Sequence, residues 1–175
     1  DCRLDFYPEL GARYCSFGAD WKTAKSKALI WGDSHAQHMA PIIEAADRDP
    51  EISFLLVNPC PAALGGSVYR VRIDRPNFRE SCQTLRQRGI DLLRADENIY
   101  LVIMAASWTG LPKNLEQDGS LPASVTGLDM LRIGIEEFID GTQAEGRKYV
   151  LIGQAPSLQF DPVPCLLSSS AYVLR

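Results

Sequence analysis

The amino-acid sequence predicts an α/β fold: a three-layer sandwich with a parallel sheet between two layers of helices. Four short runs are apolar throughout, without alternation, which is the pattern of strands buried on both faces. Segments with apolar residues three or four positions apart separate these runs and are predicted to be helices. Strand and helix therefore alternate along the chain, and such an order joins parallel neighbours through right-handed crossover connections.

The predicted elements begin after residue 26. The strands are residues 28–31, 52–57, 100–106 and 149–153, and the helices are residues 35–47, 80–95 and 125–143. Asp49-Pro50 ends the first helix, because proline disfavours the helical conformation in the residue before it. Gly141 or Gly146 ends the third helix.

The domain organisation follows from the stretches without periodicity. Residues 1–26 show none, and we expect an arm that is held by a disulfide and packs its aromatic side chains on the main domain, residues 27–175. Residues 58–77 and 111–124 are rich in proline, glycine or polar residues, which predicts loops. The first is long for a strand-to-helix connection, and long loops in compact domains often serve function.

One turn joins the first strand to the first helix. Gly32 permits a sharp exit from the strand, and Asp33 and Ser34 are residue types favoured at a helix N-cap. Ser34 is therefore predicted where a strand ends and a helix begins, which is where open α/β sheets bind ligands. Unpaired N–H groups at a helix start also suit an oxyanion. Capping alone would explain the same residue types, so both interpretations stand.

The loop at residues 58–77 is predicted to reach the same edge of the sheet. It carries a glycine pair, Gly65 and Gly66, and either backbone N–H could turn toward the serine. Tyr69 and Arg70 follow, and we assign them to substrate binding. The alternative is a solvated loop whose arginines serve solubility.

The third predicted strand ends at this edge too, in Ser107 and Trp108. The convergence of these groups suits acyl transfer, in which the Ser34 hydroxyl attacks an ester carbonyl and N–H groups stabilise the oxyanion. We place the backbone of Ser34, the glycine pair and Trp108 in this oxyanion hole.

A serine nucleophile needs a base, and the two histidines are His35 and His38. His35 adjoins Ser34 and would point in another direction, whereas His38 lies one helical turn along and can share its face. A base usually approaches from another element, where a carboxylate orients it. The alternative for both histidines is a capping or core role, and we assign Asp33 and His35 to substrate binding.

Composition and charge narrow the function classes. The chain has 175 residues, 46% of them hydrophobic and 23% charged, which is ordinary for one globular domain. The net charge of -4 argues against nucleic acid as a partner. With two histidines and no Cys-x-x-Cys pair we expect no metal, and we expect no cofactor. The sequence shows no bilayer-spanning run and no signal peptide, and its start at Asp1 suggests a processed or excised piece.

The cysteines indicate the compartment. There are five of them, Cys2, Cys15, Cys60, Cys82 and Cys165. The first two flank the aromatic arm and the next two flank a loop, as two disulfides would, and this implies an extracytoplasmic protein. Cys165 is then left over, and we expect its partner beyond the end of the sequence. Five reduced thiols in a cytosolic protein are the alternative.

The string Gly32-Asp33-Ser34-His35 resembles the first sequence block of SGNH (GDSL-like) esterases and acyltransferases, on the strand where that family has it. The wider chain is similar to the SGNH domains fused to acyltransferase-3 membrane proteins, which O-acetylate bacterial surface polysaccharides. The further matching features are Asn58-Pro59-Cys60-Pro61, Cys82, Ala105-Ala106-Ser107-Trp108, and Gly153-Gln154-Ala155-Pro156 before Cys165.

This resemblance implies an SGNH/flavodoxin-like fold and a base from an Asp-x-x-His motif near the C-terminus. The sequence contains no such motif, so we expect the chain to stop before the last catalytic block and to be inactive alone. The resemblance also implies that Cys165 pairs with a downstream cysteine. Typical SGNH hydrolases have Gly-x-Asn-Asp after the third strand, whose Asn completes the oxyanion hole, and Ala105-Ala106-Ser107-Trp108 stands here instead.

The function that the resemblance implies is transfer of an acyl group, above all acetyl, from Ser34 to hydroxyls of a bacterial cell-surface polysaccharide. The partners would be an acyl donor, relayed by a fused membrane domain, and a glycan acceptor, at the periplasmic side of the inner membrane. The same residues would serve a carbohydrate O-acetylesterase. A non-catalytic glycan-binding module lined by Trp108, Tyr69 and Arg70 is a further alternative. An α/β-hydrolase elbow fits less well, because Ser34 follows the first predicted strand.

Overall fold

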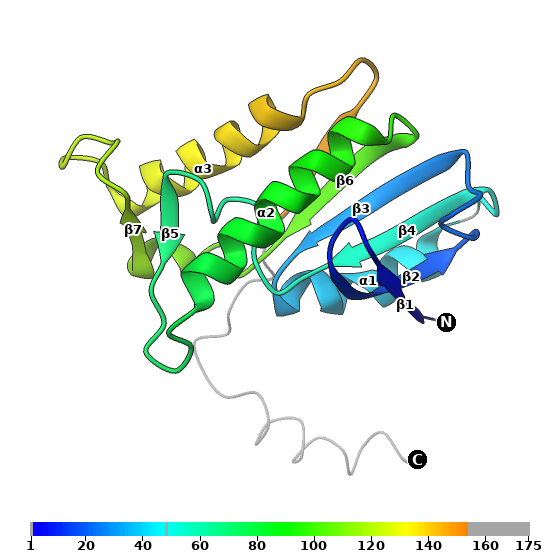
Figure 1. Cartoon of the computed structure of the whole chain (residues 1–175), viewed down its shortest axis with the longest axis horizontal. Coiled ribbons are helices and arrows are strands. Elements are labelled where there is room, and N and C mark those ends of the chain that lie inside the picture. Colours follow the sequence, from blue (N-terminus) through cyan, green and yellow to red (C-terminus); the bar gives the residue numbers. More distant parts are fainter. Residues whose placement is uncertain (1, 48, 154–175) are drawn as a thin grey trace, which may run out of the picture.

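The computed structural model describes residues 2–47 and 49–153. Its main sheet has six strands in the order β1-β2-β4-β3-β6-β8 (Figure 1). The strands are β1 (Arg3–Tyr7), β2 (Ala12–Gly18), β3 (Ser26–Gly32), β4 (Ile52–Val57), β6 (Ile99–Ala105) and β8 (Lys148–Ile152). β3, β4, β6 and β8 are parallel, whereas β1 and β2 are antiparallel and form one edge. The parallel core of the sheet agrees with the prediction.

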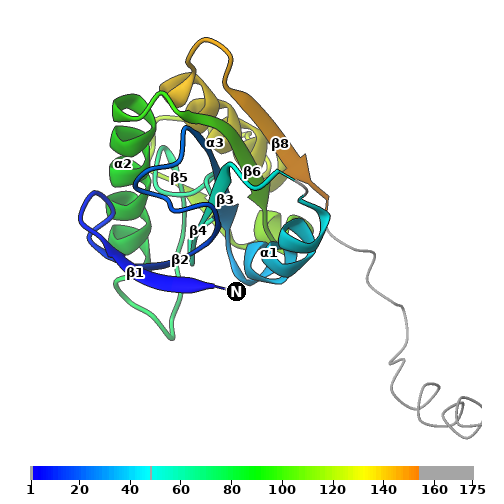
Figure 2. The ribbon, with the colours of Figure 1, turned by 90° about the vertical axis from the view of Figure 1, so that its right-hand side faces the viewer.

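Helices cover both faces of this sheet (Figure 2). α1 (Ser34–Ala46) lies on one face, and α2 (Phe78–Ala95) and α3 (Gly127–Thr142) lie on the other. Successive strand residues point to opposite faces, so Ala28 and Ile30 pack on the α1 side while Leu29 and Trp31 pack on the side of α2 and α3. Burial on both faces explains the continuous apolar run, and the predicted three-layer α/β fold is confirmed.

Two segments predicted as loops contain short regular elements. β5 (Val68–Arg70) pairs antiparallel with β7 (Leu115–Gln117), and the 3₁₀ helix η1 (Leu111–Asn114) precedes β7. The loop prediction is wrong for these residues. Strands of three residues span too few positions for a recognisable period, so their pairing depends on contacts between distant parts of the chain.

The N-terminal segment is also more regular than predicted. β1 and β2 form a hairpin, and β2 pairs with β4, so the main sheet extends across residue 26 rather than ending there. Gly11 has a positive φ of 66° in the turn between the two strands. As an edge, this hairpin is exposed on most of β1, and Phe6 is 57% exposed there. Exposed edge strands do not need the continuous apolar pattern from which the other strands were predicted.

Two disulfides join the predicted cysteine pairs, Cys2 with Cys15 and Cys60 with Cys82. The second ties the loop after β4 to α2, and both of its cysteines are buried. Disulfides of this kind fit an extracytoplasmic domain. Cys165 and its predicted pairing lie outside the described residues, as do Gln154, Ala155 and Pro156. None of the helices in the described residues is long and apolar enough to cross a bilayer.

Candidate active site

The candidate site is built on the turn between β3 and α1. β3 ends at Gly32, Asp33 is the N-cap, and α1 begins at Ser34. An added Cβ at Gly32 would lie 1.7 Å from the Ala105 carbonyl oxygen and 2.9 Å from the Ala36 Cβ. Only glycine therefore allows β3 and β6 to pair up to the point where the helix starts. Ser34 is exposed at this helix terminus, where the dipole favours negative charge.

Asp33 holds the turn to the neighbouring strand. Its Oδ1 accepts a hydrogen bond from the His35 backbone N–H at 2.8 Å and lies 3.2 Å from His35 Nδ1. Its Oδ2 accepts a hydrogen bond from the Ser107 backbone N–H at 3.0 Å, just past the end of β6. Both carboxylate oxygens thus bond to protein groups. These bonds fix the turn that carries Ser34 and His35, and the substrate contact assigned to Asp33 stays a prediction.

A pocket of about 440 Å³ opens over Ser34 at the carboxyl edge of the sheet. The strand register explains this, because the ends of β3, β4 and β6 lie side by side. The pocket is lined by residues that follow these three strand ends, by the last residue of β5 and by the loop after it, among them Asp33, Ser34, His35, Asn58, Arg70 and Ser107. The predicted residues Asp33, Ser34, His35 and Arg70 are thus brought together. Gly65, Gly66, Tyr69 and Trp108 are not among the lining residues.

The glycine pair has other contacts. The Gly65 N–H donates to the Val68 carbonyl at 2.9 Å, and its φ of 92° meets the requirements of a turn. At Gly66 an added Cβ would lie 2.3 Å from Arg86 Nη1, so this glycine makes room for a buried arginine. The Gly65 N–H is therefore used in a turn, and Gly66 lies outside the lining of the pocket, so our proposal does not use either glycine as an oxyanion donor. Tyr69 lies under the guanidinium of Arg79, 3.7 Å from its ring centroid.

The donors after β6 are also occupied. The Trp108 backbone N–H donates to the Ala106 carbonyl at 2.8 Å, and its indole Nε1 donates to the Ile152 carbonyl at 2.6 Å. The Ser107 N–H bonds to Asp33. Trp108 therefore joins the ends of β6 and β8, and we do not retain it in the oxyanion hole.

The family model described as "SGNH domain (fused to AT3 domains)" matches residues 1–174. The chain belongs to this family. Membership points to ester hydrolysis or acyl transfer as the class of reaction. Neither the comparison with curated proteins nor that with solved structures gave a match.

Sequence reasoning missed one residue of this SGNH domain as a functional group. Asn58 directly follows β4, whose last residue Val57 is the register partner of Trp31, so its side chain lies in the pocket of Ser34. Within residues 2–47 and 49–153 the Asn58 side-chain amide and the Ser34 backbone N–H have no hydrogen-bond acceptor. Its position at a strand end, next to the serine turn, was the available signal.

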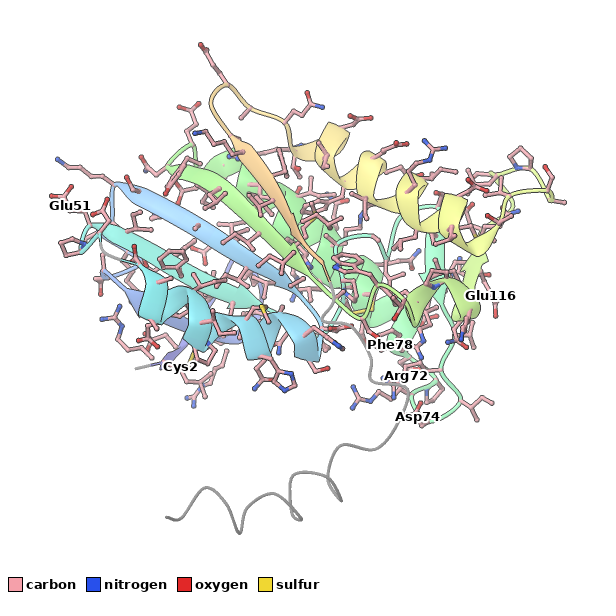
Figure 3. All side chains as sticks on the ribbon, turned by 180° about the vertical axis from the view of Figure 1, so that it is seen from behind. Cys2, Glu51, Arg72, Asp74, Phe78 and Glu116 are labelled. Atoms are coloured by element: carbon pink, nitrogen blue, oxygen red, sulfur yellow. A yellow bond between two sulfur atoms is a disulfide. The ribbon has the colours of Figure 1, made fainter. Side chains whose placement is uncertain are left out.

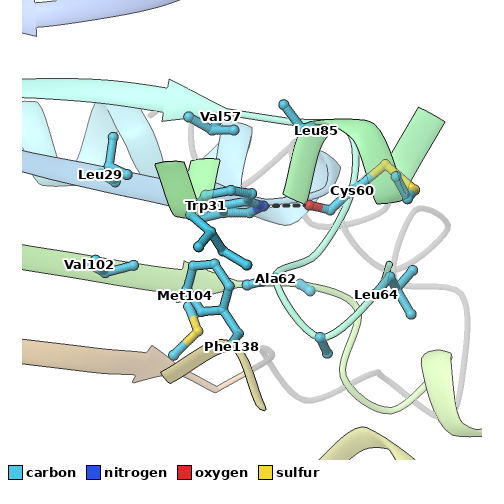
Figure 4. Close-up of a cluster of buried hydrophobic side chains, with 14 of the residues drawn as sticks. Leu29, Trp31, Val57, Cys60, Ala62, Leu64, Leu85, Val102, Met104 and Phe138 are labelled. Atoms are coloured by element: carbon cyan, nitrogen blue, oxygen red, sulfur yellow. Dashed lines mark hydrogen bonds between the residues drawn. A yellow bond between two sulfur atoms is a disulfide. The ribbon is translucent and has the colours of Figure 1, made fainter. Parts of the chain in front are cut away.

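Two interactions hold the segment that carries Asn58 (Figure 4). The indole Nε1 of Trp31, which is buried to 1% exposure, donates to the Cys60 carbonyl at 2.7 Å. The disulfide from Cys60 to Cys82 then ties the same residue to α2. Trp31 itself packs edge-on against Phe138, with ring centroids 5.0 Å apart. The backbone beside Asn58 is therefore anchored in the core, which suits a group that must keep its direction.

The two histidines of the SGNH domain differ in position. His35 lines the pocket of Ser34, but its Nδ1 is directed to Asp33, and successive helix residues do not face one another. His38 is exposed and lines other hollows, one beside Phe17 and one beside Ile152. Neither arrangement presents an imidazole that is oriented toward Ser34 from another element, as serine catalysis requires.

Proposed function

We propose that this domain transfers an acyl group, acetyl in particular, to a hydroxyl of a cell-surface glycan through Ser34. The observation that carries the proposal is the exposed Ser34 hydroxyl at the start of α1, in a pocket, in a chain of the SGNH family. An acyl donor, relayed by a fused membrane domain, and a glycan acceptor are the proposed partners. The disulfides and the family support a periplasmic place at the inner membrane.

The proposed reaction has two halves. Ser34 Oγ attacks the acyl carbonyl carbon and gives its proton to a base, and the leaving group takes a proton as its bond to that carbon breaks. The base has by then given its proton to the leaving group. A glycan hydroxyl then attacks the acyl carbon and loses its proton to the same base, the bond from that carbon to Ser34 Oγ breaks, and Oγ takes the proton back from the base. We assign the base to a histidine that this sequence does not contain, because neither His35 nor His38 approaches Ser34 from another element.

We assign the oxyanion hole to the Ser34 backbone N–H and the Asn58 side-chain amide. Both are donors without a protein acceptor among the described residues. Ser34 begins α1 just after β3, Asn58 follows β4, and both residues line the pocket. An oxygen that gains charge there would accept both hydrogen bonds and lie at the positive end of α1.

Replacing Asn58 with alanine is therefore expected to slow acylation of Ser34 by about 10²- to 10³-fold, since one donor to the developing charge is lost. The measurement is the rate of the first-turnover burst with a nitrophenyl acetate, in the intact protein. Asn98→Ala is the control, because Asn98 is exposed before β6, at the opposite end of the strand. An unchanged burst rate in Asn58→Ala would remove Asn58 from the hole.

The proposed function is tested by trapping the nucleophile. A serine-directed organophosphonate should form one adduct with the intact protein, and mass spectrometry should place it on the peptide that carries Ser34. Acetyl release from a nitrophenyl ester, with and without an oligosaccharide acceptor, then separates acyl transfer from hydrolysis. Absence of an adduct on Ser34 in a folded, intact protein would contradict the proposal.

A further inference from the structure

The pocket of Ser34 is lined by positively charged side chains, although the chain as a whole has a negative net charge. The net charge of the protein is -4, yet Arg70, Arg72 and Arg75 line this one pocket, against the carboxylate of Asp33. Both oxygens of that carboxylate already accept hydrogen bonds from the protein. The arginines come from β5 and from the loop that leads into α2, so one wall of the pocket is cationic.

One of these arginines is already neutralised. Arg72 Nε and Nη2 donate to the two oxygens of Asp74, at 3.0 and 2.5 Å, and the guanidinium lies over the Phe78 ring (Figure 3). The hydrogen bond from Arg72 lowers the pKa of the Asp74 carboxyl, so this pair stays charged on both sides. Arg72 is therefore a support of the loop rather than a free cation.

The other two arginines are available. Among the described residues, Arg70 Nε is buried and has no hydrogen-bond partner. Arg75 is exposed, and its charge helps to lower the pKa of the Asp74 carboxyl, but Arg72 already donates to both oxygens of that carboxylate. A buried cationic donor without an acceptor is costly, because it has lost water and gained nothing in return. An anionic ligand in the pocket would supply the missing acceptor, because carboxylate or phosphate oxygens accept hydrogen bonds from the planar guanidinium group.

We propose that Arg70 and Arg75 bind an anionic group of the glycan acceptor, a sugar carboxylate or a sugar phosphate. The inference rests on the proposed function for the identity of the ligand as acceptor, but binding itself needs no chemistry at Ser34. The arginines and Ser34 line the same pocket, so one glycan can contact both. The arginines hold its anionic group while one of its hydroxyls reaches the acyl-serine. An acidic polysaccharide is then preferred over a neutral one.

The test measures binding to the intact protein by calorimetry. The probes are trigalacturonate with galactotriose as its neutral match, and glucose 6-phosphate with glucose as its neutral match. We expect the affinity for the acidic sugar to exceed that for its match by about tenfold or more, and to fall as sodium chloride is raised. Preference for the uronate indicates a carboxylate, and preference for the phosphate ester indicates a phosphorylated glycan.

Matched variants locate the effect. Arg70→Gln and Arg75→Gln should each weaken binding of the acidic probe by about tenfold and leave the neutral probe unchanged. Arg75 is exposed, so its variant keeps the fold even if the partly buried Arg70 does not tolerate replacement. Arg132→Gln, an exposed arginine on α3, is the control. Equal binding of acidic and neutral sugars, no binding of either, or unchanged affinity in Arg75→Gln would each overturn the proposal.

The experiments distinguish a failure of anion binding by the arginines from a failure of acyl transfer through Ser34. Ser34→Ala should retain the binding of the acidic probe, since the serine hydroxyl is not the anion-binding group. Organophosphonate labelling of Ser34 without any acidic preference would leave acyl transfer standing and reject this inference. A preference for the acidic probe without labelling of Ser34 would support anion binding by the arginines and contradict acyl transfer through Ser34.

Discussion

Replacing Ser34 with alanine is expected to lower acyl transfer by about 10⁶-fold, the largest effect of any single change in this domain. The hydroxyl is the proposed bond-forming atom, and without it the donors of the oxyanion hole can act only on direct attack by water or sugar. Rates of acetyl release from a nitrophenyl ester by the intact protein give the measurement. The first-turnover burst should disappear together with the organophosphonate adduct.

Ser107→Ala is the matched control for this change. Ser107 is a second serine of the same pocket, and its hydrogen bonds to Asp33, Gly110 and Leu111 use its backbone N–H and carbonyl, which the variant keeps. We expect its rate to stay within about tenfold of the wild-type rate, because no bond to the acyl group passes through its hydroxyl. If Ser34→Ala retained a burst, or if Ser107→Ala abolished it, the nucleophile would be misassigned.

Gly32→Ala should be the most destabilising small substitution next to the site. The added Cβ would meet the Ala105 carbonyl oxygen at 1.7 Å and its carbon at 2.8 Å, and both belong to the backbone of β6. Because a strand backbone in the centre of the sheet cannot move without breaking its register, β3 and β6 must separate. We expect the free energy of unfolding to fall by about 3 to 5 kcal/mol.

Urea unfolding followed by tryptophan fluorescence checks this prediction, with the slope of the transition held constant between proteins. Gly141→Ala is the control: nothing lies within 4 Å of its added Cβ, and it lies in the last turn of α3. There alanine should raise the free energy of unfolding by up to about 1 kcal/mol, since it is the better helix former. A Gly32→Ala protein within about 1 kcal/mol of wild type would show that the strands adjust.

The elements with a strong period agree best with the prediction. The helix predicted at residues 80–95 is found at Phe78–Ala95, and the strand predicted at residues 52–57 is found at Ile52–Val57. The hairpin of β1 and β2 was missed because it is a half-exposed edge, and β5 and β7 were missed because each has three residues. An apolar period in the sequence arises from burial of the side chains. The hairpin is only partly buried, and β5 and β7 are too short to show a period.

Within the site, adjacent residues were predictable and distant ones were not. Gly32, Asp33 and Ser34 follow one another, so a strand end, a cap and a helix start could be inferred from residue types alone. The donors opposite Ser34 come from other strands, and their choice depends on which backbone groups are already bonded. Gly65 had the right residue type, but its N–H is used by a turn.

By itself the sequence determined the layered α/β fold, the placement of Ser34 at the end of the first parallel strand, and the two cysteine pairs, because apolar periods and cap residues are local properties. Only the tertiary structure decided that Asp33 accepts a hydrogen bond from the end of β6, that Asn58, Arg70 and Arg75 line the pocket of Ser34, and that Trp108 does not line it. These contacts depend on strand order and register, which determine the neighbours of each strand end. Neither can be inferred from the residue types next to that strand end in the sequence.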